Sequence, residues 1–103
     1  MAADKLELLI LKTLALEPLH GYGVAKRIEQ MWDGVFRVTL GSLYPALQRL
    51  ERDGLVLADW KASENGRRAR YYRLTASGRK RLEVEQKDWE RVAAAIARVL
   101  RAT

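Results

Sequence analysis

Residues 41–60, GSLYPALQRLERDGLVLADW, contain the change of periodicity that decides the fold. Leu43, Leu47 and Leu50 recur at the spacing of one buried helix face, and Gly54 supplies a C-terminal stop. Beyond Gly54 the pattern alternates and is rich in β-branched and aromatic residues, which is typical of a strand. The stretch predicts a helix followed directly by the first strand of a hairpin.

A proline constrains where this helix begins. The helix is expected to start between Thr39 and Ser42 and to end at Asp53. Pro45 has no N–H and is comfortable only in the first turn, which favours Ser42 as the N-cap. If Thr39 caps the helix instead, the first turn must be tightened.

A second strand completes the hairpin. The two strands are expected at residues 56–60 and 70–74, with a turn at residues 63–66 between them. This turn contains Asn-Gly, the strongest short signal for a hairpin. A small two-stranded β wing is therefore expected after the helix.

The first helix is apolar at almost every position of residues 6–16. Asp4 would cap it, with Glu7 in capping-box position, and Pro18 would stop it. A helix that is apolar nearly all round must be covered on two sides. One side can pack on its own domain, and the other needs more protein.

A second helix is expected from about Tyr22 to Trp32, after a break at residues 20–23. Its apolar residues recur at intervals of four and three. Asp33-Gly34 would end it, and residues 35–38 would form an extended connection to the third helix.

The last helix completes the predicted order of helix, helix, helix, hairpin, long helix. Thr75 is a good N-cap, and the helix would run to about Leu100, roughly 26 residues or about 39 Å. The fold class is mainly α with a small two-stranded β wing. A winged helix-turn-helix over residues 1–74 and a C-terminal helix over residues 75–103 would form one compact unit.

Composition bounds the class of protein. The chain has 103 residues, 49% of them apolar, which suits a single compact domain with a core. It has no cysteine, which removes disulfides and thiolate metal sites and fits a reducing cytoplasm. The N-terminal apolar run contains Glu7 and Lys12 and is far shorter than the roughly 20 residues of a membrane span. We expect a cytoplasmic protein without a membrane segment.

Basic side chains concentrate around the hairpin turn. The net charge of +6 favours a polyanionic partner. Arg67, Arg68 and Arg70 follow the turn, and Lys61 faces them from the first strand. Guanidinium groups on a protruding hairpin suit phosphate contact or minor-groove insertion, although a solubilising hairpin edge is the alternative.

The third helix is the candidate reader of the DNA major groove. Its N-terminus offers backbone N–H groups, the Ser42 hydroxyl and the Tyr44 phenol, which suit phosphate. Gln48 and Arg49 lie one turn further on, where they could reach base edges. An ordinary solvated helix face is the alternative, but close backbone approach to a partner explains Gly41 better.

An apolar seam on the last helix predicts a homodimer. Leu82, Trp89 and Ile96 are seven residues apart, and Val92 and Val99 lie three beyond the latter two. The alternative is a helix folded back on its own domain. The predicted dimerisation residues are Leu6, Leu9, Ile10, Leu82, Trp89, Val92, Ile96 and Val99. A two-fold dimer would place two reading helices about 34 Å apart, which predicts a palindromic DNA site.

Catalytic chemistry has no residues to support it. His20 is the one histidine and has no cysteine or carboxylate cluster nearby, so a contact at a helix entry is the expected role. The sequence contains no Gly-rich phosphate loop and no nucleophile motif. We expect no enzyme activity, no metal and no cofactor.

Several short motifs occur together along the chain. They are Leu9-Ile10-Leu11, Leu19-His20-Gly21-Tyr22-Gly23, the segment from Gly41 to Leu47, Arg49-Leu50-Glu51, Gly54-Leu55, Gly66-Arg67-Arg68, Tyr71-Tyr72-Arg73-Leu74-Thr75 and Gly78. In this combination the chain resembles the PadR-like transcriptional regulators, in the short form with a single C-terminal dimerisation helix. The resemblance covers almost the whole chain up to Trp89.

The resemblance implies a repressor-like regulator that dimerises through its first and last helices. The third helix would read a palindromic promoter site, and the wing would touch flanking DNA. Carried over by position, Tyr22, Ser42, Tyr44 and Pro45 would lie at the DNA surface. Some relatives bind planar aromatic molecules beside a tryptophan of the last helix, so Trp89 is a possible site for a small aromatic effector, with plain core packing as the alternative.

The sequence as a whole predicts a homodimeric, sequence-specific regulator that binds double-stranded DNA. The predicted DNA-binding residues are Tyr22, Thr39, Ser42, Tyr44, Pro45, Gln48, Arg49, Lys61, Arg67, Arg68 and Arg70. A winged-helix protein-interaction module without specific DNA binding is the alternative.

Overall fold

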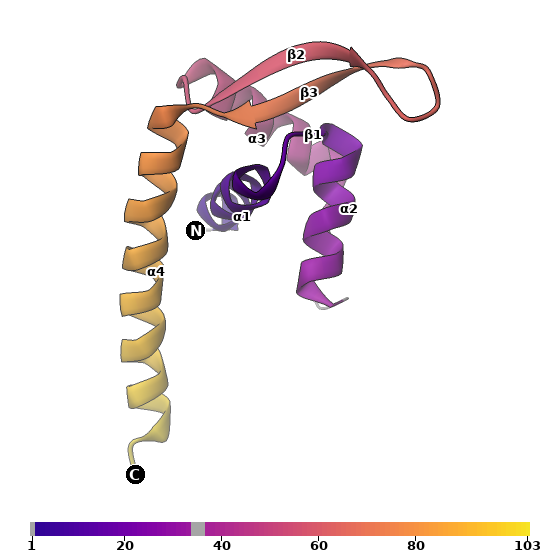
Figure 1. Cartoon of the computed structure of the whole chain (residues 1–103). Coiled ribbons are helices and arrows are strands. Elements are labelled where there is room, and N and C mark those ends of the chain that lie inside the picture. Colours follow the sequence, from indigo (N-terminus) through magenta and orange to yellow (C-terminus); the bar gives the residue numbers. More distant parts are fainter. Residues whose placement is uncertain (1, 34–36) are drawn as a thin grey trace.

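The computed structural model describes residues 2–33 and 37–103. The described residues form four helices and one small sheet that lies at one end of the molecule, and the last helix extends away from the body as an arm (Figure 1). Within the described residues, no helix is long and apolar enough to cross a membrane. The elements are α1 (Ala2–Leu16), β1 (Leu19–His20), α2 (Gly21–Trp32), α3 (Leu40–Arg52), β2 (Val56–Ala62), β3 (Arg68–Leu74) and α4 (Ala76–Arg101).

Helix α1 lies at the centre and contacts α2, α3, β3 and α4. Ile10, Leu11 and Leu14 are at most 2% exposed, which confirms that this apolar helix must be covered on more than one side. The expected stop before Pro18 is confirmed, because α1 ends at Leu16. The predicted cap at Asp4 is wrong, because the helix already begins at Ala2.

The sheet has three strands in the order β1-β3-β2, so the predicted number of two strands is wrong by one. The third strand is the segment Leu19–His20, which pairs antiparallel with Tyr71 and Tyr72 of β3. Two residues are too few to show the alternation by which a strand is predicted. The helix-entry role of His20 is confirmed, because its Nδ1 accepts a hydrogen bond of 3.0 Å from the Gly23 N–H.

Helix α2 ends at the predicted place. Asp33 caps it in the left-handed conformation at φ 54°, and its N–H donates to the Gln30 carbonyl. Residues 34–36, which belong to the predicted stop and the predicted extended connection, lie outside the described residues.

Helix α3 begins with a tightened first turn, the alternative to a cap at Ser42. Thr39 is the N-cap, and its Oγ1 accepts from the Ser42 N–H at 3.2 Å. The Thr39 carbonyl accepts from both Ser42 and Leu43, at 3.1 and 2.9 Å. The favoured cap at Ser42 is therefore wrong, and Pro45 lies inside the helix at an exposed position.

The C-terminus of α3 ends as the sequence predicts. Gly54 adopts φ 73°, its N–H donates to Glu51, and the Leu55 N–H donates to Leu50. This pair of bonds is a Schellman motif, which turns the chain directly into β2.

The hairpin of β2 and β3, here called the wing, extends two residues further at its tip than predicted. Val56 pairs with Leu74 at its base, and both are buried in the core. The pairs that follow on the same face become progressively more exposed toward the tip; they are Ala58–Tyr72, Trp60–Arg70 and Ala62–Arg68. The outer half of the wing therefore stands free of the body, as Figure 1 shows.

Helix α4 starts at a tight junction with the end of α3. Thr75 caps α4 by accepting from the Gly78 N–H at 3.0 Å, and its hydroxyl donates to the Gly54 carbonyl at 2.7 Å. The Leu55 carbonyl accepts from the Thr75 N–H and lies so close to Gly78 that a Cβ there would sit 2.1 Å from it. The predicted cap and length of this helix are confirmed.

The packing places two predicted dimerisation residues in the core of the protomer. Ile10 is 0% exposed and Leu82 is 8% exposed, so both side chains contribute mainly to the core of the protomer, and a role in dimerisation stays a prediction. The other members of the predicted set keep some or much of their surface open to solvent; they are Leu6, Leu9, Trp89, Val92, Ile96 and Val99.

Gly78→Ala is expected to destabilise the fold by on the order of 1–3 kcal/mol, because the new Cβ must push the Leu55 backbone away. Urea unfolding followed by circular dichroism measures the change. Gly41→Ala is the matched control, since only Thr39 Oγ1 lies within 4.0 Å of a Cβ there and the helix gains an alanine. Equal stability of wild type and Gly78→Ala would contradict the tight packing of Gly78 on Leu55.

Candidate nucleic-acid interface

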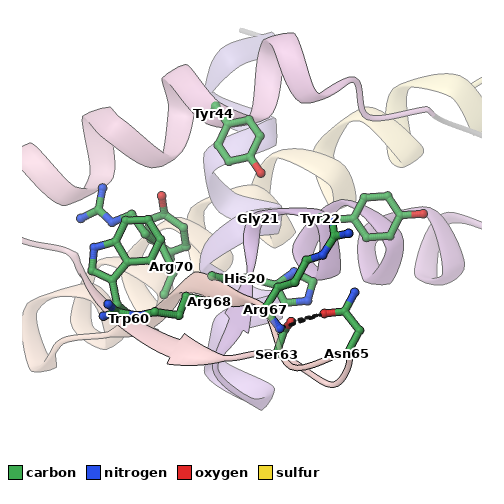
Figure 2. Close-up of a pocket in the computed structure, with 12 residues that line it drawn as sticks. His20, Gly21, Tyr22, Tyr44, Trp60, Ser63, Asn65, Arg67, Arg68 and Arg70 are labelled. Atoms are coloured by element: carbon green, nitrogen blue, oxygen red, sulfur yellow. Dashed lines mark hydrogen bonds between the residues drawn. The ribbon is translucent and has the colours of Figure 1, made fainter.

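An open groove of about 490 Å³ lies between the start of α2, the helix α3 and the inner face of the wing. We call it the aromatic groove. Figure 2 shows Tyr44 reaching down from α3 toward Gly21, with Trp60 and Arg68 on one side and Tyr22 and Arg67 on the other. The groove is lined by His20, Gly21, Tyr22, Tyr44, Trp60, Ser63, Asn65, Arg67, Arg68, Ala69, Arg70 and Tyr72.

The position of Tyr44 depends on a glycine. A Cβ on Gly21 would lie 2.6–2.8 Å from three atoms of the Tyr44 side chain, so the phenol packs where any other residue would have its side chain. Tyr44 and the neighbouring Tyr22 remain 42% and 55% exposed. The two phenols are therefore available to an external partner, with Lys26 Nζ 5.7 Å from the Tyr22 ring.

The wing supplies the free positive charge of the groove. Arg67 and Arg68 are exposed, and neither forms an ion pair with any residue in the described part of the chain. The loop before them is ordered by Asn65, whose Oδ1 accepts from the Ser63 hydroxyl at 2.6 Å and the Arg67 N–H at 3.3 Å. Lys61 is exposed but does not line the groove, and its Nζ lies 5.8 Å from the Tyr71 ring.

Two other arginines predicted to bind DNA are paired with carboxylates. Arg70 Nη2 lies 2.8 Å from Glu51 Oε2 of α3, and this pair holds the wing to the helix. Arg49 Nε lies 3.0 Å from Glu7 Oε2 of α1, away from the aromatic groove. Sequence patterns could not reveal either pair, because their members are 19 and 42 residues apart.

The remaining predicted residues form the outer face of α3. Thr39, Ser42, Pro45 and Gln48 are exposed, and the last three follow one another at intervals of three, as neighbours on a helix do. The Thr39 hydroxyl also donates to Ser42 Oγ at 3.1 Å, so the cap orients the serine. This face lies next to Tyr44 on the same helix, although only Tyr44 lines the groove.

Tyr72 lines the groove and, at 5% exposed, also belongs to the core. Burial raises the pKa of its phenol above the ordinary value, although the Arg70 guanidinium acts in the opposite direction. No group of three histidine, cysteine or carboxylate side chains that could hold a metal occurs among residues 2–33 and 37–103.

Sequence patterns did not identify Trp60 as a residue of the groove. Its alternation with Val56 places both on the core face of the strand, and Val56 is indeed buried. Trp60 is 59% exposed because the strand has run beyond the core by that point. The length of the strand could have revealed this exposure, because a strand longer than the core is wide must leave its outer residues uncovered.

Helices α2 and α3 with the arginine-bearing wing beside them define a winged helix-turn-helix, a class of DNA-binding domain. Residues 10–84 match the Transcriptional regulator PadR-like family. The chain therefore belongs to the PadR-like family of transcriptional regulators, and its function is DNA-binding regulation of transcription.

Relatives support this assignment. The chain is 34% identical to the transcriptional regulator Rv3488 of Mycobacterium tuberculosis over 84 residues, which are 82% of this chain and 75% of that protein. It is 39% identical over 92 residues to an uncharacterised 37.1 kDa protein of a Streptomyces fradiae transposon, covering 89% of this chain and only 25% of that one.

Solved structures share the whole architecture. A PadR-like transcriptional regulator from Bacillus cereus superposes with a TM-score of 0.84 at 28% identity, covering 95% of this chain and 93% of that one. The smu.1704 protein of Streptococcus mutans gives a TM-score of 0.85 at 30% identity, covering 95% of this chain and 88% of that one.

Gly21→Ala is expected to weaken promoter binding, because its Cβ would displace the Tyr44 phenol. Tyr44→Ala should cost about 1–3 kcal/mol of binding free energy. Fluorescence anisotropy with labelled promoter DNA measures both. If the glycine acts through the ring, Gly21→Ala has no further effect in a Tyr44→Ala background. An equal decrease in both backgrounds would show that Gly21 acts in another way.

Proposed function

We propose that this chain is a homodimeric repressor that binds a palindromic promoter site. The observation that carries the proposal is the pair of unneutralised guanidinium groups, Arg67 and Arg68, which flank the same groove as Tyr44 of α3. Phosphate contacts from the wing would fix the register of the domain on the duplex, while α3 reads the major groove.

The exposed face of α3 suits the reading role. Its first turn presents Gly41, which has no side chain to hold the backbone away from a partner, beside Ser42 and Pro45. Gln48 lies one turn further along and carries both a donor and an acceptor for a base edge. Arg49 is a further candidate contact. Its ion pair with Glu7 would have to break before the guanidinium could reach DNA.

The dimer would form through α1 and α4. The arm exposes large apolar side chains, among them Trp89 (43%), Val92 (38%), Ile96 (50%) and Val99 (72%). An exposed apolar surface of this kind is typical of a site that another protein covers. A two-fold pair covering this surface would bring two α3 helices onto one side of the duplex, about one helical turn apart. Two DNA-bound winged helix-turn-helix domains would block access of other proteins to the promoter. This is the basis for proposing repression.

A second groove, of about 460 Å³, lies between α1 and α4 and is bordered by Trp89. Its volume falls within the range of small-molecule sites. We propose it as the place for a planar aromatic effector, stacked against the indole, whose ring already has Lys5 Nζ 5.3 Å away. Because a regulator of transcription acts where the DNA is, we also propose a cytoplasmic location.

The Arg67→Ala, Arg68→Ala double variant is expected to bind operator and scrambled DNA more weakly by similar factors. Each phosphate contact that is removed should reduce the slope of log affinity against log salt by about 1, so the double variant should lose about 2. Arg73→Ala is the matched control, because its guanidinium is paired with Asp59 at 3.3 Å. A nearly flat salt response of the wild type would instead favour the protein-interaction module.

Trp89→Glu and Ile96→Glu together are expected to give monomers, because two carboxylates would be placed in the apolar surface of α4. Sedimentation equilibrium measures the mass. Lys87→Glu, an exposed change on the same helix, is the control for charge alone. A dimer that survives the double substitution would locate the interface elsewhere.

A further inference from the structure

The inner face of the wing carries two arginines that are held in different ways. Trp60 is directly opposite Arg70 across the strands, and Ala62 is opposite Arg68, so the indole lies beside one arginine and diagonal to the other. Arg70 is bound by the Glu51 carboxylate at 2.8 Å, and its Cζ lies 5.8 Å from the Tyr72 ring. Arg68 Cζ lies 5.7 Å from the Trp60 ring.

The chemical consequences of these two arrangements differ. A carboxylate orients a guanidinium but neutralises it and occupies its N–H groups. An aromatic face orients the guanidinium through its quadrupole and leaves the charge and the N–H edge free. Within the described part of the chain, the Arg68 guanidinium faces the indole and is paired with no carboxylate. Arg68 is therefore ordered and still fully available to an anion.

Packing of the protomer core does not account for Trp60. Its side chain is 59% exposed and lies four residue pairs beyond the buried base of the wing at Val56 and Leu74. The same indole borders the aromatic groove (Figure 2). This exposed tryptophan thus contacts a cation that faces the candidate DNA surface.

We propose that Trp60 is a positioning residue for DNA binding. Its ring holds the Arg68 guanidinium with the N–H edge turned toward a phosphate of the duplex, so that less side-chain entropy is lost on binding. This inference rests on the proposed DNA-binding function and goes beyond it, since it gives one aromatic residue a role that acts through another side chain.

A double-mutant cycle on promoter DNA tests the proposal. Trp60→Ala is expected to lower affinity about two- to fivefold, the range that corresponds to an exposed cation–π contact. In an Arg68→Ala background the same change should have no effect. Trp60→Phe should restore most of the affinity, because it keeps a ring face, while Trp60→Leu should behave like Trp60→Ala.

Leu57→Ala is the matched control. Leu57 is 44% exposed on the same strand but alternates to the opposite face, so its removal should leave DNA affinity unchanged. Thermal unfolding midpoints of all variants should agree within a few degrees, because neither side chain belongs to the buried core.

Three outcomes would overturn the proposal. Unchanged affinity of Trp60→Ala would show that DNA binding does not require the indole ring to orient Arg68. Effects that multiply in the double variant would mean that Trp60 acts independently of Arg68. Both results leave the proposed DNA-binding function intact. A wild type that shows no salt-dependent DNA binding would overturn the proposed function and this inference with it.

Discussion

Helix α1 carries apolar side chains on almost every side, and water must be excluded from most of them. The rest of the protomer is arranged to do this, since α2, α3, β3 and α4 all contact it. Ile10, Leu11 and Leu14 have essentially no exposed surface as a result. Because α1 contacts both α3 and β3, it helps to fix the position of α3 relative to the wing. The aromatic groove is a consequence of that placement, not a separately built feature.

Local signals explain why so much of the fold could be predicted. The Gly54 stop, the Thr75 cap and the change of period after α3 each depend on residues within a few positions of one another. Those interactions are encoded by spacing alone, so they can be read before the chain is folded. The same reasoning predicted which residues of the third helix are buried and where the wing lies along the chain.

The features that could not be predicted are those that depend on tertiary distance. The pairing of Arg49 with Glu7 and of Arg70 with Glu51 requires that α1, the wing and α3 have already met. A helical pattern shows that Ile10 and Leu82 are apolar, but whether they face their own core or a partner is decided by the packing. Similarly, the alternation of β2 places Trp60 on the face that packs on the core. Its side chain borders the groove instead, because the wing extends beyond the core at that point.

The junction between α3 and α4 fixes the direction in which the last helix leaves the body. Thr75 and the backbone of Gly54 and Leu55 are joined by hydrogen bonds, and Gly78 leaves no slack against the Leu55 carbonyl. The 26 residues of α4 span about 39 Å, so a tilt of about 5° at this junction displaces the far end by roughly 3 Å. If two chains join along α4, as proposed, a displacement of that size would be about the rise of one base pair. In such a dimer, the close packing of Gly78 on Leu55 would thus help to set the distance between the two α3 helices on the duplex.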